Sequence, residues 1–212
     1  MHKRINWALA LIITVSALTS LASVETDKSI KIDPSFYNIT PYDLVYGNDD
    51  APIEVLEYYS LTCPHCAYFY INVFPSLKKK YIDTGKVKWI KRLYVRDRAA
   101  LEGTLLLNCV DKSKRENYLR ILLAKQSNWA FQKNPGEVLE NIANLGGISK
   151  QNFQKCMDDK KAAHEMHALT TKAIEVAGVT GTPSFYVNLE KLEAFSDQAF
   201  KDRFNEILAI NK

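Results

Sequence analysis

The stretch LEYYSLTCPHCAYFY, residues 56–70, is the part of this 212-residue chain that decides its fold and its chemistry. Cys63 and Cys66 stand two residues apart, between a β-branched and aromatic run and a set of apolar residues at helical spacing. Pro64 follows Cys63, and proline is favoured in the first turn of a helix. The pair therefore lies at a predicted strand-to-helix junction. Three interpretations compete there: a structural disulfide, half of a metal site, and a reactive dithiol.

The chain around this junction reads as strands and helices in alternation. Residues 53–60 and 86–95 are predicted strands, and the helix predicted between them, residues 64–82, makes a βαβ unit with parallel strands. Shorter strands are predicted at residues 44–46, 184–187 and 189–195, the last an antiparallel partner of the second. Residues 98–177 read as helix, which is too long for one crossover. An amphipathic helix capped by Ser196 closes the chain.

This order of elements predicts an α/β protein with a thioredoxin-like fold and an inserted helical subdomain. The sheet is expected to be mixed, with helices on both faces. The composition, 47% apolar and 25% charged, is that of an ordinary globular protein and argues against disorder. The predicted division is a signal peptide at 1–22, the N-terminal part of the thioredoxin-like domain at 23–97, the helical insertion at 98–160, and the C-terminal part at 161–212.

The first 22 residues have the pattern of a cleaved secretory signal peptide. A basic head ending in Arg4 precedes an uncharged run, and the small residues Ser20 and Ala22 suit cleavage after Ala22. The alternative is an uncleaved membrane anchor, since the uncharged run is near the lower length limit for spanning a bilayer. Cleavage leaves 26 basic and 24 acidic residues, a net charge of +2, which does not favour nucleic acid or anionic membrane as a partner.

A metal site and a structural staple are the weaker interpretations of the cysteine pair. Structural zinc needs four ligands, and the chain has one CxxC motif, so no metal is predicted. The neighbouring histidines His164 and His167 are three residues apart and miss the zincin spacing of four. A disulfide that closes so short a loop removes little chain entropy and would stabilise the fold weakly.

A reactive dithiol explains the pair best, because the thiolate is the nucleophile and the start of a helix favours an anion. Cys63 is predicted to be the exposed, attacking thiol, and Cys66, one turn into the helix, the shielded resolving thiol. Pro64 fixes the local backbone. His65 is expected to add a hydrogen-bond donor and, when protonated, a positive charge. An exported chain enters an oxidising compartment, which allows such a disulfide.

Two further segments complete the predicted site. Glu57 lies on the predicted buried strand, where it is interpreted as an acid/base of raised pKa that moves the Cys66 proton; the alternative is an edge carboxylate facing solvent. The loop at Thr182 and Pro183 is predicted to run beside the cysteines. A cis bond there would leave the Thr182 backbone free to pair with an extended substrate by strand addition.

With these residues in place, the chain resembles the DsbA family of bacterial periplasmic thiol:disulfide oxidoreductases. The resemblance rests on GNDDAPIEVLEYYSLTCPHC, residues 47–66, and GVTGTPSFYVN, residues 178–188, on either side of a helical stretch. It implies that Cys63 forms mixed disulfides with unfolded exported proteins and that Cys66 resolves them. It also implies Glu57 as the buried acid, Pro183 as the cis residue, reoxidation by a membrane partner of the DsbB type, and no cofactor.

The chain departs from the best-known members of that family at two places. Thr182 stands where their pattern has valine, and threonine there resembles disulfide isomerases and some other DsbA-like groups. The insert carries Cys109 and Cys156 in predicted helices. They are predicted to form a second, structural disulfide, which resembles DsbA-like proteins of alphaproteobacteria. The alternative is two buried free thiols.

The sequence thus predicts a monomeric periplasmic enzyme that introduces disulfide bonds into exported proteins through its CPHC motif. Residues 23–46 are too few for the dimerisation domain that isomerases of this fold use. An isomerase or reductase of the same fold remains the first alternative. A metal-handling or peptide-holding module without catalytic activity is the alternative from another class.

Overall fold

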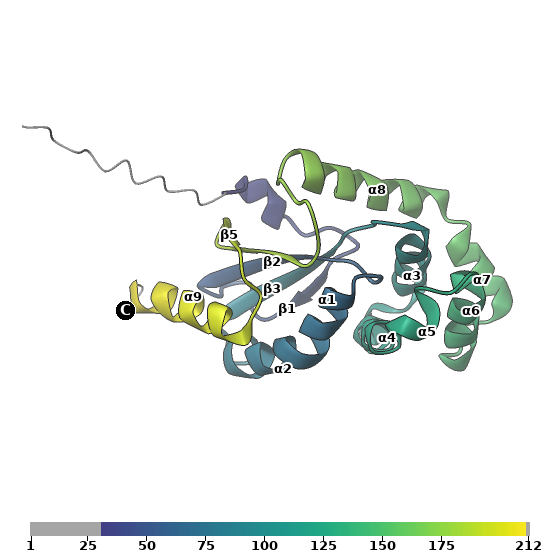
Figure 1. Cartoon of the computed structure of the whole chain (residues 1–212), viewed down its shortest axis with the longest axis horizontal. Coiled ribbons are helices and arrows are strands. Elements are labelled where there is room, and N and C mark those ends of the chain that lie inside the picture. The colour runs from purple at the N-terminus through teal and green to yellow at the C-terminus, as the bar shows by residue number, and fades with distance from the viewer. Residues whose placement is uncertain (1–30, 211–212) are drawn as a thin grey trace, which may run out of the picture.

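The computed structural model describes residues 31–210, so the predicted signal peptide lies outside the described residues (Figure 1). Five strands form one sheet in the order β1-β3-β2-β4-β5. β2 and β3 are parallel, and the other neighbours are antiparallel, so the sheet is mixed as predicted. The strands are β1 (Leu44–Tyr46), β2 (Ile53–Tyr59), β3 (Val87–Leu93), β4 (Ser184–Val187) and β5 (Glu190–Leu192).

The two central strands are buried on both faces, because side chains alternate between two apolar clusters. Val55 and Tyr59 of β2 enter the larger cluster, under α2 (Phe74–Leu77) and α9 (Asp197–Ile210). Leu56 and Tyr58 enter the smaller one, under α8 (Lys160–Glu175). Figure 1 shows α8 across one face of the sheet and α2 and α9 along the other. Glu57 is therefore on the same face as Val55 and Tyr59.

The helix predicted over residues 64–82 is present but is not a regular α-helix. It runs as α1 (Pro64–Tyr68), the π-helical turn η2 (Phe69–Val73), α2 and the π-helical turn η3 (Lys78–Ile82). The N–H of Phe74 donates to the carbonyl of Phe69, five residues back, and Pro75 has no N–H to donate. The irregular turn η2 therefore occurs just before a proline, which interrupts the ladder of helical hydrogen bonds.

The helical insertion gathers at one end of the sheet (Figure 1). Its helices are α3 (Arg98–Cys109), α4 (Lys112–Ala124), α5 (Gln126–Trp129), α6 (Pro135–Leu145) and α7 (Lys150–Met157). Trp129 is fully buried and donates from Nε1 to the Leu122 carbonyl at 2.8 Å. Gly103 of α3 packs so closely that a Cβ there would lie 2.9 Å from the Trp129 ring and 3.1 Å from Leu61. The insertion is thereby joined directly to the segment that precedes the CPHC motif.

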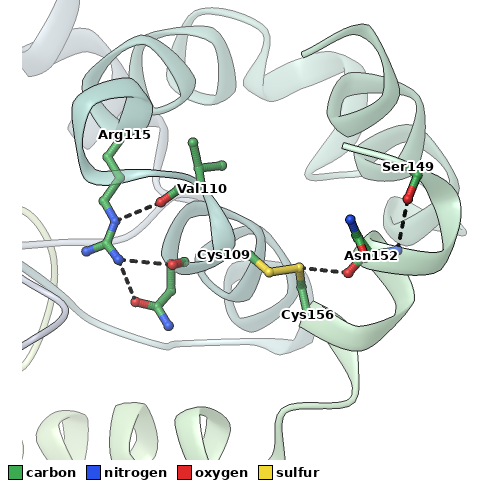
Figure 2. The surroundings of a disulfide bond; sticks show 7 residues. Cys109, Val110, Arg115, Ser149, Asn152 and Cys156 are labelled. Atoms are coloured by element: carbon green, nitrogen blue, oxygen red, sulfur yellow. Dashed lines mark hydrogen bonds between the residues drawn. A yellow bond between two sulfur atoms is a disulfide. The ribbon is translucent and has the colours of Figure 1, made fainter. Parts of the chain in front are cut away.

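A disulfide between Cys109 and Cys156 ties the end of α3 to the end of α7, with the two Cα atoms 5.8 Å apart (Figure 2). The last carbonyls of α3 are satisfied from α4: Arg115 donates to the carbonyl of Asn108 at 3.0 Å and to that of Val110 at 3.3 Å. Cations near a helix C-terminus also favour its dipole. The bond and this cap hold three helices of the insertion together.

The described chain begins at the opposite edge of the sheet. Lys31 forms a bridge with Glu190 of β5, and their side chains are paired at 3.0 Å. The short 3-10 helix η1 (Pro34–Tyr37) follows. Arg92 of β3 then fixes this segment, donating from Nη1 to the Phe36 carbonyl at 2.6 Å. Its Nε and Nη2 donate to the two carboxylate oxygens of buried Asp43 at 3.0 and 2.7 Å. Within residues 31–210, no helix has the length and apolar character needed to cross a membrane.

Candidate active site

Cys63 occupies the N-cap position of α1, as the sequence predicts. Its N–H donates to the Ser60 carbonyl at 3.2 Å, and its own carbonyl accepts from the Ala67 N–H at 3.2 Å. The sulfur consequently lies beside the first N–H groups of the helix, which have no partner inside the helix. This is the position at which a negative charge on sulfur is most stabilised by backbone dipoles.

The loop before β4 meets the dithiol from a point 119 residues further along the chain. The Thr182–Pro183 bond is cis, and the thiol of Cys63 donates to the Thr182 carbonyl at 3.0 Å. Cys63 is only 2% exposed and Cys66 only 1%. The expectation of an exposed Cys63 is therefore wrong for this form of the protein, since the Thr182 loop lies against the sulfur.

The two thiols have opposite ionisation behaviour. The pKa of Cys63 is lowered from 9.0 to about 5, first by a hydrogen bond from the Cys66 thiol, then by the Thr182 side chain and by the backbone N–H groups of Cys66 and His65, while burial opposes the shift. Burial raises the pKa of Cys66, and the neighbouring Cys63 and Glu57 raise it further. At neutral pH the site thus holds one thiolate and one thiol. The helix start contributes as predicted, but the largest contribution is that of Cys66.

His65 is placed differently from the sequence-based expectation. Its backbone N–H is one of the groups that lower the pKa of the Cys63 thiol, after the Cys66 thiol, which contributes most. Its exposed imidazole packs near the ring of Phe195, with the ring centroids 6.0 Å apart. Phe195 lies between β5 and α9, so the imidazole connects the start of α1 to this distant loop. Pro64 occupies the first turn of α1, as predicted.

Glu57 is buried, with 1% exposure, and one oxygen of its carboxylate accepts two donors. Trp89 donates from Nε1 to Oε2 at 2.8 Å, and the buried ammonium of Lys91 forms an ion pair with the same oxygen. Glu57 and Lys91 are directly paired across the parallel strands β2 and β3. Their charges act on the Cys66 thiol, since both groups couple to it electrostatically. The solvent-facing alternative for Glu57 is thus wrong.

Lys91 is the site residue that sequence reasoning missed. Its side chain is 1% exposed, and its Nζ lies 4.1 Å from the centroid of the Phe74 ring. Burial lowers the pKa of Lys91, and the Glu57 carboxylate offsets part of that effect. Aromatic faces attract a cation, so the rings compensate for some of its lost hydration. The other rings around Nζ are those of Phe69, Tyr70 and Trp89.

The other cysteines and histidines among residues 31–210 lie away from this site. Cys109 and Cys156 are bonded to each other in the disulfide of the insertion. His164 and His167 are exposed on α8. Among residues 31–210 there is no group of three or more His, Cys, Asp or Glu side chains arranged to hold a metal ion. The chemistry available to the described site is therefore that of two thiols, a buried ion pair and oriented backbone dipoles.

Comparison with known proteins identifies the family. The family described as Thioredoxin matches residues 39–205. A candidate protein-disulfide oxidoreductase of Rickettsia bellii is 33% identical over an alignment of 193 positions that covers 87% of this chain and 74% of that protein. A counterpart in Rickettsia typhi is 35% identical over 82% of this chain. The chain spans 62% of that longer relative.

A solved structure agrees with these relatives. The crystal structure of alpha-DsbA1 from Wolbachia pipientis superposes with a TM-score of 0.74 at 29% sequence identity, over 82% of this chain and 94% of that one. The chain thus belongs to the thioredoxin family, as a protein thiol:disulfide oxidoreductase of the DsbA type.

Proposed function

We propose that this protein donates the Cys63–Cys66 disulfide to thiols of proteins exported to the bacterial periplasm, and so introduces disulfide bonds into them. One observation carries the proposal: Cys63, with a pKa lowered to about 5, faces Cys66, whose pKa is raised. A dithiol that is stabilised as a thiolate favours the reduced form, and its disulfide is therefore a strong oxidant. The described structure, with both thiols free, corresponds to the reduced product of the exchange.

The exchange proceeds in two steps. A substrate thiolate attacks the sulfur of Cys63, the Cys63–Cys66 bond breaks, and Cys66 leaves with the electron pair and takes up a proton. A second substrate thiolate then attacks the substrate sulfur of the mixed disulfide, and Cys63 leaves as a thiolate. Two electrons pass to the protein, and the substrate gains one disulfide. Because a thiol of low pKa leaves fastest, the second step is the one that the structure favours most.

The buried ion pair has a role in the first step. The leaving sulfur of Cys66 has a high pKa and needs a proton. Glu57 and Lys91 are the ionisable pair that couples to it from the neighbouring strands. We assign to this pair the transfer of that proton, and the release of the Cys66 proton in the reverse direction.

The Thr182 loop is proposed to receive the substrate. Its carbonyl lies 3.0 Å from the Cys63 sulfur, so a substrate cysteine bound to that sulfur would bring its own backbone beside Thr182. An extended peptide can pair there with the loop backbone. Since Cys63 is buried in the reduced form, reoxidation of the dithiol by a partner protein requires the Thr182 contact with the sulfur to open.

Export and reoxidation complete the proposal. Residues 1–22 have the signal-peptide pattern, and mass spectrometry of protein recovered from a periplasmic fraction is expected to find a chain starting at Ser23. Turnover requires an oxidant for the reduced dithiol, which we propose is a quinone-linked membrane protein of the DsbB type. Membranes that contain such a protein should restore the disulfide, and membranes without it should not.

The function is tested by two assays run side by side: oxidation of a reduced two-cysteine peptide, and refolding of scrambled ribonuclease. We expect rapid peptide oxidation by the wild-type protein and none by the Cys63→Ser variant. Strong isomerase turnover with poor peptide oxidation would assign the protein to the isomerases. Full biological activity of a Cys63→Ser, Cys66→Ser double variant would instead point to a binding module.

A further inference from the structure

The loop that leads into the dithiol is held by the helical insertion through a buried amide. Gln126, at the start of α5, is 5% exposed. Its Nε2 donates to the carbonyl of Leu61 at 2.7 Å and to the carbonyl of Cys63 at 3.0 Å. Both N–H bonds of this one amide are therefore used on the backbone of the catalytic loop.

A second contact holds the same loop from the same side. The hydroxyl of Thr62 donates to Asp97 at 2.7 Å, and Asp97 is also the N-cap of α3. Residues 61, 62 and 63 are thus each tied to the insertion, but only the Gln126 amide reaches the residue that carries the attacking sulfur. Buried Trp129, at the other end of α5, donates to the Leu122 carbonyl of α4 and so anchors the short helix that carries Gln126.

The carbonyl of Cys63 receives two donors, which is the basis of the inference. One is the Ala67 N–H, at 3.2 Å, which makes the first hydrogen bond of α1, and the other is Gln126. The orientation of this peptide group sets the N-cap geometry, and that geometry directs the N–H groups of His65 and Cys66 toward the sulfur. A change in its orientation therefore changes the stabilisation of the thiolate.

We propose that Gln126 is a positioning residue for thiol–disulfide exchange: it holds the Cys63 peptide group in the geometry that favours the reduced form over the disulfide. The proposal rests on the exchange function proposed above. The helical insertion would then act directly on the redox equilibrium of the dithiol, in addition to covering one end of the sheet. Removing the amide should make the protein a weaker oxidant.

The test compares Gln126→Leu with Gln132→Leu in the full mature chain. Gln132 carries the same side chain a few residues along, but it is exposed and donates only to the Ser127 carbonyl at 3.3 Å. We expect Gln126→Leu to shift the redox equilibrium with glutathione about three- to tenfold toward the disulfide, as expected for lost hydrogen bonds in one redox form. The pKa of the Cys63 thiol, followed by ultraviolet absorbance, should rise. Gln132→Leu should change neither quantity.

A purely structural role predicts a different result. It would destabilise the reduced and oxidised forms equally and leave the glutathione equilibrium within about twofold of wild type, a factor that corresponds to under half a kcal/mol. That outcome overturns the proposal. If Gln126→Leu does not fold, Gln126→Asn takes the same test, because its shorter side chain cannot reach both carbonyls. Failure of the wild type to oxidise peptides would refute the proposed function alone, since the glutathione equilibrium remains measurable.

Discussion

The Cys66 thiol is the first cause of the low pKa of Cys63, so its removal gives the most direct test of the site. In a Cys66→Ala variant the Cys63 sulfur loses a hydrogen bond to its charged form. Such bonds are worth about 1.5–3 kcal/mol, which corresponds to a rise of about one to two pKa units. Starting from about 5, the thiol should therefore titrate between about 6 and 7.

The same shift predicts a pH dependence of stability. The pKa of Cys63 is lower in the folded reduced protein than in the unfolded chain, so ionisation of this thiol stabilises the reduced fold. The full stabilisation is present above about pH 9, the pKa of the unfolded chain. This stabilisation declines as the pH falls from 9 toward 5 and is lost below it. At pH 7 it amounts to about 2.7 kcal/mol for the wild type and to between about 0.4 and 1.4 kcal/mol for Cys66→Ala. The oxidised protein, which has no free Cys63 thiol, should lack it.

The assay is titration of thiolate absorbance in the reduced wild type and in Cys66→Ala, with urea unfolding at two pH values as the second measurement. Cys63→Ser, which has no attacking thiol, is the baseline for both. The reasoning is refuted if the variant still titrates near pH 5. It is also refuted if the wild type titrates like an ordinary free cysteine, because neither the helix start nor Cys66 would then stabilise the thiolate.

Three further outcomes are expected. Lys91→Met leaves a buried carboxylate unpaired and should lower the free energy of unfolding by about 3–5 kcal/mol. The matched Lys88→Met, whose acidic partners are more exposed, should cost under about 1 kcal/mol, and equal losses in urea unfolding would contradict the buried pair. The double variant Cys109→Ala, Cys156→Ala opens a link across 47 positions and should lose about 2–4 kcal/mol by the same measurement; no loss would mean that the bond does not constrain the unfolded chain. Thr182→Val removes a side-chain donor and should raise the pKa of the attacking thiol by about one unit, while Thr182→Ser should restore it; an unchanged titration in the valine variant would exclude that donor.

The sequence was informative wherever a local pattern determines local structure. The β-branched runs gave all five strands within a few residues, and Pro64 placed the dithiol at a helix start. The segment around Pro183 was recognisable because a turn signal preceded an apolar strand. The helix over residues 64–82 was identified, but its two π-helical turns were not, since the spacing of apolar residues does not reveal whether an N–H bonds four or five residues back.

The features of the site that could not be predicted from the sequence depend on contacts between segments that are distant along the chain. Lys91 became a partner of Glu57 through the register of β2 and β3, and a lysine within an apolar run carries no sign of its register. The burial of Cys63 follows from the approach of Thr182, which no local pattern encodes. Gln126 lies on a helix of four residues, too short to show a period.

The edge at which the described chain begins determines how an attached leader would orient the molecule. Lys31 pairs with Glu190 at the end of the sheet where β2 starts, and Cys63 lies beyond the other end of that seven-residue strand, about 20 Å away. A leader that stayed in the membrane would therefore be attached at Lys31, on the side of the protein remote from Cys63. The dithiol would then face away from the point of attachment.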